Sequence, residues 1–437
     1  MKTSFGPKRL SGLAPSLACG LVLLLSACAT SAPRPPAPIS SGDPRVDPVQ
    51  EIPEDVAEAP EETGLEDLEP TETEDAAGAL PPHMVGREVV RAAVLLPFSH
   101  SNRNVRAEAE GILAGIEMGV FEHADENFLI IPKDTGGTAS GAEAATRSAL
   151  NEGVDIVLGP LFSSSVQAAA STAKEDNVPL LAFSNDRAAA GNGAYLASIG
   201  IEEEIAEIIA YARSRGVESF AFLGPENSYG RRIESALRFE TARLGGQVIA
   251  SGFYSPSNDA PVQEAAAVAS ALSAEAARIP NRVAVLIPER GVKLRAVAPL
   301  LPYSGVDTRY VVFLGTSQWN DPTVWREPTL INGFFPAAPS EDIGKFERDF
   351  ERIYGGAPTG LASLGYDAAA LASSLAAAGD PFDRITLTDP NGYRGVNGLF
   401  RFRVDGTAER GLSIMQITKD EGAIEVQPGA ARFGDDA

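Results

Sequence analysis

The chain has very few of the residues from which metal, redox and disulfide sites are built. Its 437 residues include 3 His and 2 Cys, whereas zinc sites, iron–sulfur clusters and disulfide frameworks each need several. Basic residues are also scarce: 36 Lys and Arg stand against 59 Asp and Glu, for a formal net charge of −23. Because a polyanion backbone is bound by clustered Lys and Arg, nucleic acid is excluded as a partner. We expect no metal site and no cofactor.

Motifs of common catalytic sites are missing as well. The sequence has no Gly-x-Ser-x-Gly elbow, no His-Glu-x-x-His pair and no phosphate-cradling Gly-Lys-Ser/Thr loop. None of the three histidines lies at a spacing typical of a metal ligand or of a nucleophile's base. We predict that the protein is not an enzyme.

The N-terminus predicts export. Basic residues precede the apolar stretch Leu13–Leu25, which is short for a membrane span and suits a signal-peptide core. It ends in Leu25-Ser26-Ala27-Cys28, which resembles the lipobox of bacterial lipoproteins; the alternative is an ordinary signal peptide with a chance cysteine. The resemblance implies that residues 1–27 are removed and that an acylated Cys28 anchors the chain to a membrane. Ala29 follows instead of an aspartate, which favours the periplasmic face of the outer membrane.

Residues 28–88 are predicted to be a disordered, Pro- and Glu-rich tether. Between Asp43 and Asp75 the chain carries 14 acidic side chains against the single Arg45. Such a segment buries too little apolar surface to offset the entropy lost on ordering. We interpret it as a spacer, with an acidic docking peptide as the alternative.

The rest of the chain alternates apolar strands with helices. Strands are predicted at 89–97, 129–132, 155–158, 179–183, 219–223, 247–252, 282–287 and 309–314. Helices are predicted at 107–121, 141–151, 164–176, 203–215, 230–244, 261–277 and 292–301. Short apolar runs separated by helices of this length indicate parallel βαβ units.

The series restarts near residue 201, which predicts an α/β fold with two doubly wound, Rossmann-like lobes around a cleft. We assign residues 89–200 plus 336–395 to lobe 1 and 201–335 plus 396–420 to lobe 2, with a C-terminal tail at 421–437. Chain crossings between the lobes are expected near 199–201, 333–336 and 395. A terminal hairpin is expected over Gly398–Ile417, around Asp405-Gly406.

Ordered short motifs over residues 89–420 resemble type I periplasmic binding proteins of the Leu/Ile/Val-binding class. The motifs are Val94-Leu95-Leu96-Pro97, Asp134-Thr135, Gly153 to Pro160 before Ser163-Ser164-Ser165, Val178-Pro179, Asn227-Ser228-Tyr229-Gly230 and Tyr366-Asp367-Ala368. Within that superfamily the lipobox, the tether and the segment from Trp319 to Pro336 resemble penicillin-binding protein activators. Activators with a longer chain carry a helical-repeat domain where this chain has the tether, so no role of that domain carries over.

The resemblance implies a cleft for a small polar ligand. In relatives that bind amino acids, a serine after the Gly-Pro strand holds the ligand carboxylate, and Ser163, Ser164 and Ser165 occupy that place. These serines can equally cap a helix. Tyr229 either stacks on a ligand or packs a helix start, and Tyr366 with Asp367 is expected to form a helix-start and hinge feature.

Two departures weaken the amino-acid interpretation. Relatives have a threonine loop where this chain reads Ser184-Asn185-Asp186, and Asp186 would repel a ligand carboxylate unless Arg187 offsets it. Relatives also place a carboxylate in lobe 2 to accept the ligand ammonium. The matching strand end here offers neutral Ser317 and Gln318.

The leading hypothesis is a non-enzymatic periplasmic lipoprotein that activates a bifunctional penicillin-binding protein in peptidoglycan synthesis. The alternative is a substrate-binding lipoprotein that delivers branched-chain amino acids to an ABC transporter. A third hypothesis is a cleft-ligand sensor that signals through lobe closure.

Overall fold

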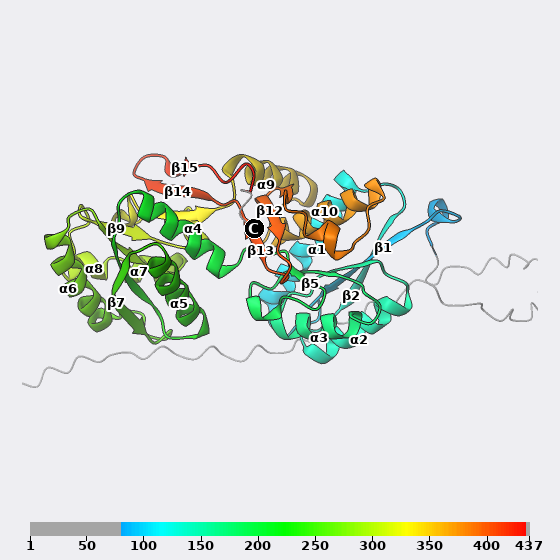
Figure 1. The fold of residues 1–437 in the computed structure, drawn as a ribbon, viewed down its shortest axis with the longest axis horizontal. Coiled ribbons are helices and arrows are strands. Elements are labelled where there is room, and N and C mark those ends of the chain that lie inside the picture. The colour runs from blue at the N-terminus through cyan, green and yellow to red at the C-terminus, as the bar shows by residue number, and fades with distance from the viewer. Residues whose placement is uncertain (1–79, 434–437) are drawn as a thin grey trace, which may run out of the picture. The chain divides into compact units, whose positions relative to one another are not determined.

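The computed structural model describes residues 80–433 (Figure 1). The predicted signal peptide, the lipidation site Cys28 and residues 28–79 of the predicted tether lie outside these residues. Residues 80–88 of that tether include a 3-10 turn at Pro82–Met84, whose Met84 is buried. Between residues 80 and 433, no helix is both long and apolar enough to cross a membrane.

A five-stranded parallel sheet forms the first lobe. Its order is β2-β1-β3-β4-β5, with strands β1 (Val90–Leu96), β2 (Phe128–Asp134), β3 (Ile156–Leu158), β4 (Leu180–Ala182) and β5 (Ala194–Leu196). Helices α1 (Arg103–His123), α2 (Ala139–Asn151) and α3 (Ser163–Ala173) connect the strands. Successive side chains of a strand point to opposite faces. Val94 therefore packs with Ile112 of α1, and Leu95 packs with Val166 of α3 on the other face.

Helix α10 (Ala362–Ala378) lies against α1 at very short range. A Cβ at Gly115 of α1 would collide with the backbone carbonyl of Ala362. Only glycine permits this approach, and the contact holds α10 on the face of the first sheet where Leu364 and Ala368 join the core.

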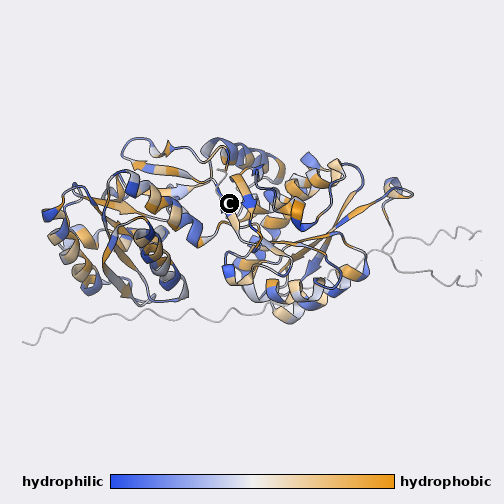
Figure 2. Ribbon diagram, in the orientation of Figure 1, coloured by the Kyte–Doolittle hydropathy of each residue, from blue (hydrophilic) through white to orange (hydrophobic). Residues whose placement is uncertain are grey.

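A seven-stranded mixed sheet forms the second lobe, in the order β15-β14-β10-β9-β8-β6-β7. Its strands are β6 (Ser219–Pro225), β7 (Gln247–Tyr254), β8 (Val283–Leu286), β9 (Val311–Leu314), β10 (Phe334–Ala337), β14 (Ser413–Thr418) and β15 (Gly422–Gln427). Its helices are α4 (Ile201–Ser214), α5 (Ser228–Arg243), α6 (Val262–Arg278), α7 (Gly291–Val297) and α8 (Leu300–Tyr303). Phe222 of β6 packs under α4 and α5, while Leu223 packs under α6. In Figure 2 inner strands of the two sheets, such as β1 and β8, carry mostly the hydrophobic colour, as expected of strands buried on both faces.

The remaining elements are α9 (Ser340–Tyr354), α11 (Arg384–Leu387), β11 (Tyr393–Gly395), β12 (Gly398–Phe402) and β13 (Ala408–Arg410). The strands β11, β12 and β13 form a small antiparallel sheet. Phe400 and Phe402 of β12 belong to the core of the first lobe, because their rings pack with the apolar face that β1 and α10 share.

The fold class is confirmed: the chain is α/β with two doubly wound lobes. The boundaries differ from those predicted after residue 395, since β12 and β13 pack with the first lobe. The predicted hairpin is shorter than expected, because β14 leaves β13 to pair with β10. Residues 422–427, assigned to a tail, form β15 on the edge of the second sheet.

The sheet and core memberships place the chain crossings at residues 197–200, 338–339 and 411–412. The predicted helix 292–301 is wrong as a single element. It is divided into α7 and α8, and Pro299 lies between them; a proline cannot donate the backbone hydrogen bond that a continuous helix needs.

Candidate functional site

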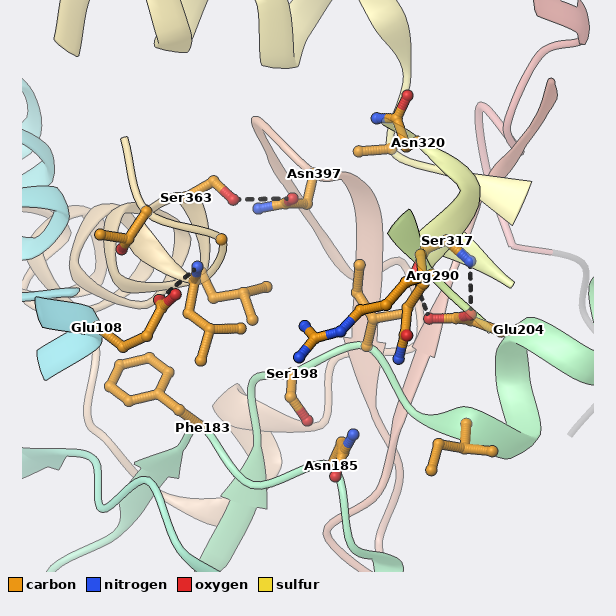
Figure 3. Close-up of a pocket in the computed structure, with 18 of the residues that line it drawn as sticks. Glu108, Phe183, Asn185, Ser198, Glu204, Arg290, Ser317, Asn320, Ser363 and Asn397 are labelled. Atoms are coloured by element: carbon orange, nitrogen blue, oxygen red, sulfur yellow. Dashed lines mark hydrogen bonds between the residues drawn. The ribbon is translucent and has the colours of Figure 1, made fainter. Parts of the chain in front are cut away.

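A cavity of about 1230 Å³ lies at the carboxyl ends of the strands in both lobes (Figure 3). The first lobe contributes segments after β3, β4 and β5 and the start of α10. The second contributes the starts of α4 and α5 and the segments after β8 and β9. Ligand sites of open α/β sheets form at this edge, because the loops that leave the strands diverge there.

The turn from β3 into α3 places one of the three candidate serines in the cavity. Gly159 has φ +114°, a backbone conformation that favours glycine, and a Cβ there would collide with the carbonyl of Leu95. Ser163 lines the cavity, whereas Ser164 is exposed to solvent outside it and Ser165 is buried with no partner for its hydroxyl. No serine side chain caps α3, whose N-cap residue is Phe162, so the predicted cap is wrong.

Ser163 instead binds a carboxylate of the chain itself. Its Oγ donates to Asp186 Oδ2 at 3.1 Å. Asp186 also accepts from the backbone N–H of Ala188 at 3.2 Å and lies 3.8 Å from Arg232 of α5. Arg232, rather than the predicted Arg187, is therefore the cation beside Asp186. The Asp186 carboxylate therefore accepts the Ser163 hydroxyl, which the resemblance to amino-acid-binding relatives had assigned to a ligand carboxylate.

The other candidates after β4 also line the cavity. Ser184 is buried, and its backbone carbonyl accepts the hydroxyl of Ser198 at 2.6 Å. Asn185 is exposed, and its carbonyl accepts Arg232 Nη2 at 3.2 Å. The Asn185 side chain points into the cavity (Figure 3).

The second lobe brings Tyr229, Ser317 and Gln318 to the opposite side of the cavity. Gln318 Nε2 donates to the Tyr229 hydroxyl at 2.9 Å. Tyr229 is partly buried and packs on the core beneath α4 and α5, so it supports the helix start and lines the cavity at once. Burial, with the nearby Glu204 and Glu289 carboxylates, raises the pKa of Tyr229, which keeps its hydroxyl neutral.

The sequence analysis missed a carboxylate in the second lobe. Glu204 lines the cavity and is 8% exposed; its Oε2 accepts the Ser317 backbone N–H at 2.9 Å and its Oε1 the Ser317 hydroxyl at 2.7 Å (Figure 3). Burial raises its pKa to about 7, although both hydrogen bonds act in the opposite direction. The charged neighbour that acts on it is another acid, Glu203. A buried carboxylate without a cation is costly, so an incoming cation would be favoured here.

A signal for Glu204 was present in the sequence. In α4 the apolar positions Ile201, Ile205 and Ile208 repeat at helical spacing, and residue 204 falls on the same face. A charged residue on the buried face of a helix indicates a special environment. No comparable pattern marks Arg290, which precedes α7 and also lines the cavity.

A buried ion pair lies next to the cavity and connects two chain crossings. Asp367 accepts the backbone N–H of Val396 at 2.7 Å and lies 3.6 Å from Arg410 Nη1. Arg410 in turn donates to the carbonyls of Ala197 at 2.8 Å and Ser198 at 3.0 Å. Asp367 therefore acts on segments beside the crossings. It is not at the start of α10, which begins at Ala362, so the expected helix-start feature is wrong, and the expected hinge role stays a prediction.

Comparisons with known proteins agree with this architecture. The family model described as periplasmic binding protein matches residues 90–423. No curated protein sequence matches the chain.

Solved structures match across nearly their whole length. A putative branched-chain amino acid ABC transporter protein from Rhodospirillum rubrum is 19% identical with a TM-score of 0.66, covering 77% of this chain and 99% of its own. The branched-chain amino acid transporter substrate-binding protein of Streptococcus pneumoniae, in complex with isoleucine, is 17% identical with a TM-score of 0.53 and coverages of 78% and 100%. A solute-binding protein of an ABC transporter from R. palustris, in complex with benzoate, is 15% identical with a TM-score of 0.53 and coverages of 80% and 99%. At these identities the likeness is one of fold.

Proposed function

The chain belongs to the family of periplasmic binding proteins, and we propose that it is a solute-binding protein whose cleft takes a small ligand carrying an amino group. The family consists of binding proteins rather than enzymes, as the sequence predicts. Transport of the solute by an ABC permease is part of this proposal, because the structural neighbours are proteins of branched-chain amino acid transporters. This proposal is close to the alternative hypothesis from the sequence, a substrate-binding lipoprotein of an ABC transporter. The class of ligand is inferred here from the side chains that line the cavity.

The observation that carries this proposal is the buried Glu204 carboxylate. Both of its oxygens are fixed by Ser317, so it is held rigidly at the cavity wall. An ammonium bound beside it would supply the missing countercharge and stabilise the ionised form. In this proposal the acid of the second lobe comes from α4, instead of from the strand end at Ser317 and Gln318.

The test is a binding titration of the full chain with 3-methylbutylamine, an organic amine that stays singly protonated at both pH values, at pH 8 and pH 6. Binding is expected at pH 8 and is expected to weaken at pH 6, because Glu204, with a pKa of about 7, must lose its proton to pair with the amine. Glu204→Gln should lose this binding, while Glu347→Gln, an exposed glutamate that also lines the cavity, should retain it. Equal binding by the two variants would contradict the proposal.

A second candidate is regulation of a bifunctional penicillin-binding protein from the periplasmic face of the outer membrane. The resemblance of residues 319–336 to activators supports it. The Asp186 carboxylate supports it too. Because this carboxylate accepts the Ser163 hydroxyl, that serine is not free to bind a ligand carboxylate as in amino-acid-binding relatives. Capture of partners from lightly cross-linked membranes tests it: recovery of a penicillin-binding protein without a permease would favour this candidate, and recovery of a permease would remove it.

A periplasmic location agrees with the family. The lipid anchor at Cys28 lies outside the described residues and remains a prediction. Mass spectrometry of the protein purified from membranes would test it, because acylation adds the mass of the lipid to a peptide that begins at Cys28.

A further inference from the structure

After the last strand of the second sheet, the chain turns back toward the first lobe (Figure 1). Strand β15 ends at Gln427, on the edge of the second sheet. The ring of Phe433, near the C-terminus, lies against β12, a strand whose aromatic side chains belong to the core of the first lobe. Residues 428–433 therefore pass between the lobes once more, after the three crossings described above.

This segment lies directly against the third crossing. The backbone N–H of Gly429 donates to the Ser413 hydroxyl at 2.9 Å, and a Cβ on Gly429 would collide with the carbonyl oxygen of Gly411. A Cβ on Gly411 would in turn lie 2.9 Å from the carbonyl oxygen of Ala430. Two backbones approach so closely only where glycine leaves the space of a side chain empty. The third crossing and this segment are therefore packed too closely to move independently.

Strand β15, which leads into the segment, also contacts the second crossing. The carboxylate of Glu425 accepts the backbone N–H of Ser340 at 3.3 Å and the Ser340 hydroxyl at 3.5 Å. Ser340 is the first residue of α9 and follows the crossing at 338–339, and α9 packs with α1 and α10 of the first lobe. A carboxylate is stabilised by the free N–H groups of a helix start. These bonds therefore join the two lobes immediately before the segment begins.

Phe433 is held by an arginine that is itself fixed. Arg401 of β12 pairs with Glu409 of β13 at 2.9 Å and donates to the Pro390 carbonyl at 3.0 Å. Its guanidinium carbon lies 4.5 Å from the centre of the Phe433 ring, within the range of an attractive cation–π contact. A Cβ on Gly392 would lie 2.9 Å from the same ring, so the ring fits a space that exists because residue 392 is glycine.

Most of the segment is nevertheless exposed to solvent. Four of residues 428–433 are exposed, and only Gly429 and Phe433 are partly buried. A segment with so few buried contacts opens locally at a small cost in free energy. It can therefore detach and reattach while both lobes stay folded.

We infer that residues 428–433 form a strap that restrains rotation of the lobes about their crossings, with Phe433 as its anchor on the first lobe. The attached strap holds the third crossing against the end of β15. The detached strap leaves the crossings free to bend over a wider range of angles. No residue of the strap lines the cavity, so the inference is independent of the ligand and of the function proposed above.

Attachment of the strap is measured by hydrogen exchange in the full chain. The backbone N–H of Gly429 is bonded to Ser413 only while the strap is attached, so its exchange rate reports detachment. Phe433→Ala should raise that rate at least about fivefold, because it removes the cation–π contact with Arg401. Arg432→Gln, at the exposed neighbouring position, is the matched control and should leave the rate unchanged.

The range of lobe angles is measured by the distance between two spin labels, one on each lobe, in the ligand-free chain. Cys19 and Cys28, the two cysteines of the sequence, are replaced by serine. Labels are attached at Ser171→Cys of α3 and Ser270→Cys of α6, which are exposed positions. Phe433→Ala should broaden the distribution of label distances, and the control variant should not.

Two results would overturn the inference. Unchanged exchange at Gly429 in Phe433→Ala would show that the ring is no anchor. Faster exchange with an unchanged distance distribution would show that the segment detaches but restrains nothing. Phe433→Tyr, which keeps an aromatic ring beside Arg401, should match the unsubstituted chain in both measurements. An unchanged thermal midpoint for Phe433→Ala confirms that a broader distribution reflects the released strap rather than an unfolded lobe.

Discussion

Replacing Glu204 by glutamine should change how the stability of the second lobe depends on pH. In the folded chain the pKa of this carboxyl is about 7, against an ordinary value of 4.5. An acid whose pKa is raised on folding binds more protons in the folded state, so its contribution to stability is present at low pH and is lost as pH rises from about 4.5 to 7. Glutamine does not titrate, and the variant should lack that part of the pH dependence.

The size of the effect follows from the pKa difference. Each pH unit corresponds to 1.36 kcal/mol, so the difference gives about 3 kcal/mol for full conversion. Measured as variant minus wild type, the free energy of unfolding should therefore rise by about 3 kcal/mol between pH 4.5 and pH 8. Glutamine will also weaken one of the two bonds with Ser317, but that loss is a constant offset and leaves the slope unchanged.

Urea unfolding followed by tryptophan fluorescence is the assay. The chain has two tryptophans, Trp319 and Trp325, and both pack in the core of the second lobe, so the signal reports the lobe that holds Glu204. Glu203 titrates in both proteins, and burial, the largest cause of its raised pKa, is the same in both. Parallel curves for Glu204→Gln and wild type, within about 0.5 kcal/mol from pH 4.5 to 8, would refute the reasoning. Glu347→Gln should give such parallel curves.

Two ion pairs and one close contact between helices can be tested by substitution. Asp367→Asn should cost about 3–5 kcal/mol of unfolding free energy, because it strips the counter-ion from buried Arg410; chemical denaturation measures it, and a loss below about 1 kcal/mol would contradict the pairing. Gly115→Val should cost about 3 kcal/mol, at the upper end of overpacking effects, because its side chain meets the Ala362 carbonyl; an unchanged thermal midpoint would show that α1 and α10 do not approach so closely. Arg232→Gln, at a partly exposed ion pair, should change unfolding by less than about 1 kcal/mol yet increase the radius of gyration of the ligand-free chain in X-ray scattering. An unchanged radius would mean that its contact with the Asn185 carbonyl does not hold the lobes together.

Buried parallel strands were predictable from the sequence, whereas the antiparallel strands near the C-terminus were not. Strands such as Val283–Leu286 are short, wholly apolar and flanked by helices, and such runs are recognisable because a parallel strand is buried on both faces. The same reasoning failed at β12, because Phe400 and Phe402 are compatible with either lobe until their packing is known. Hairpin β14–β15 was missed since partly exposed residues 422–427 carry no strong apolar pattern.

The two α/β lobes and most of the segments that line the cavity could be predicted from the sequence, because local apolar periodicity and the order of strands and helices can be read along the chain. The predicted strand ends also placed Ser163, Asp186 and Ser317 at the edge of the sheets where the cavity lies. Which charges face one another could not be predicted, because it depends on how distant segments pack. Asp186 takes the hydroxyl of Ser163, and Glu204 reaches Ser317 from 113 residues away, because partners so far apart in sequence are chosen by packing and leave no mark on local pattern.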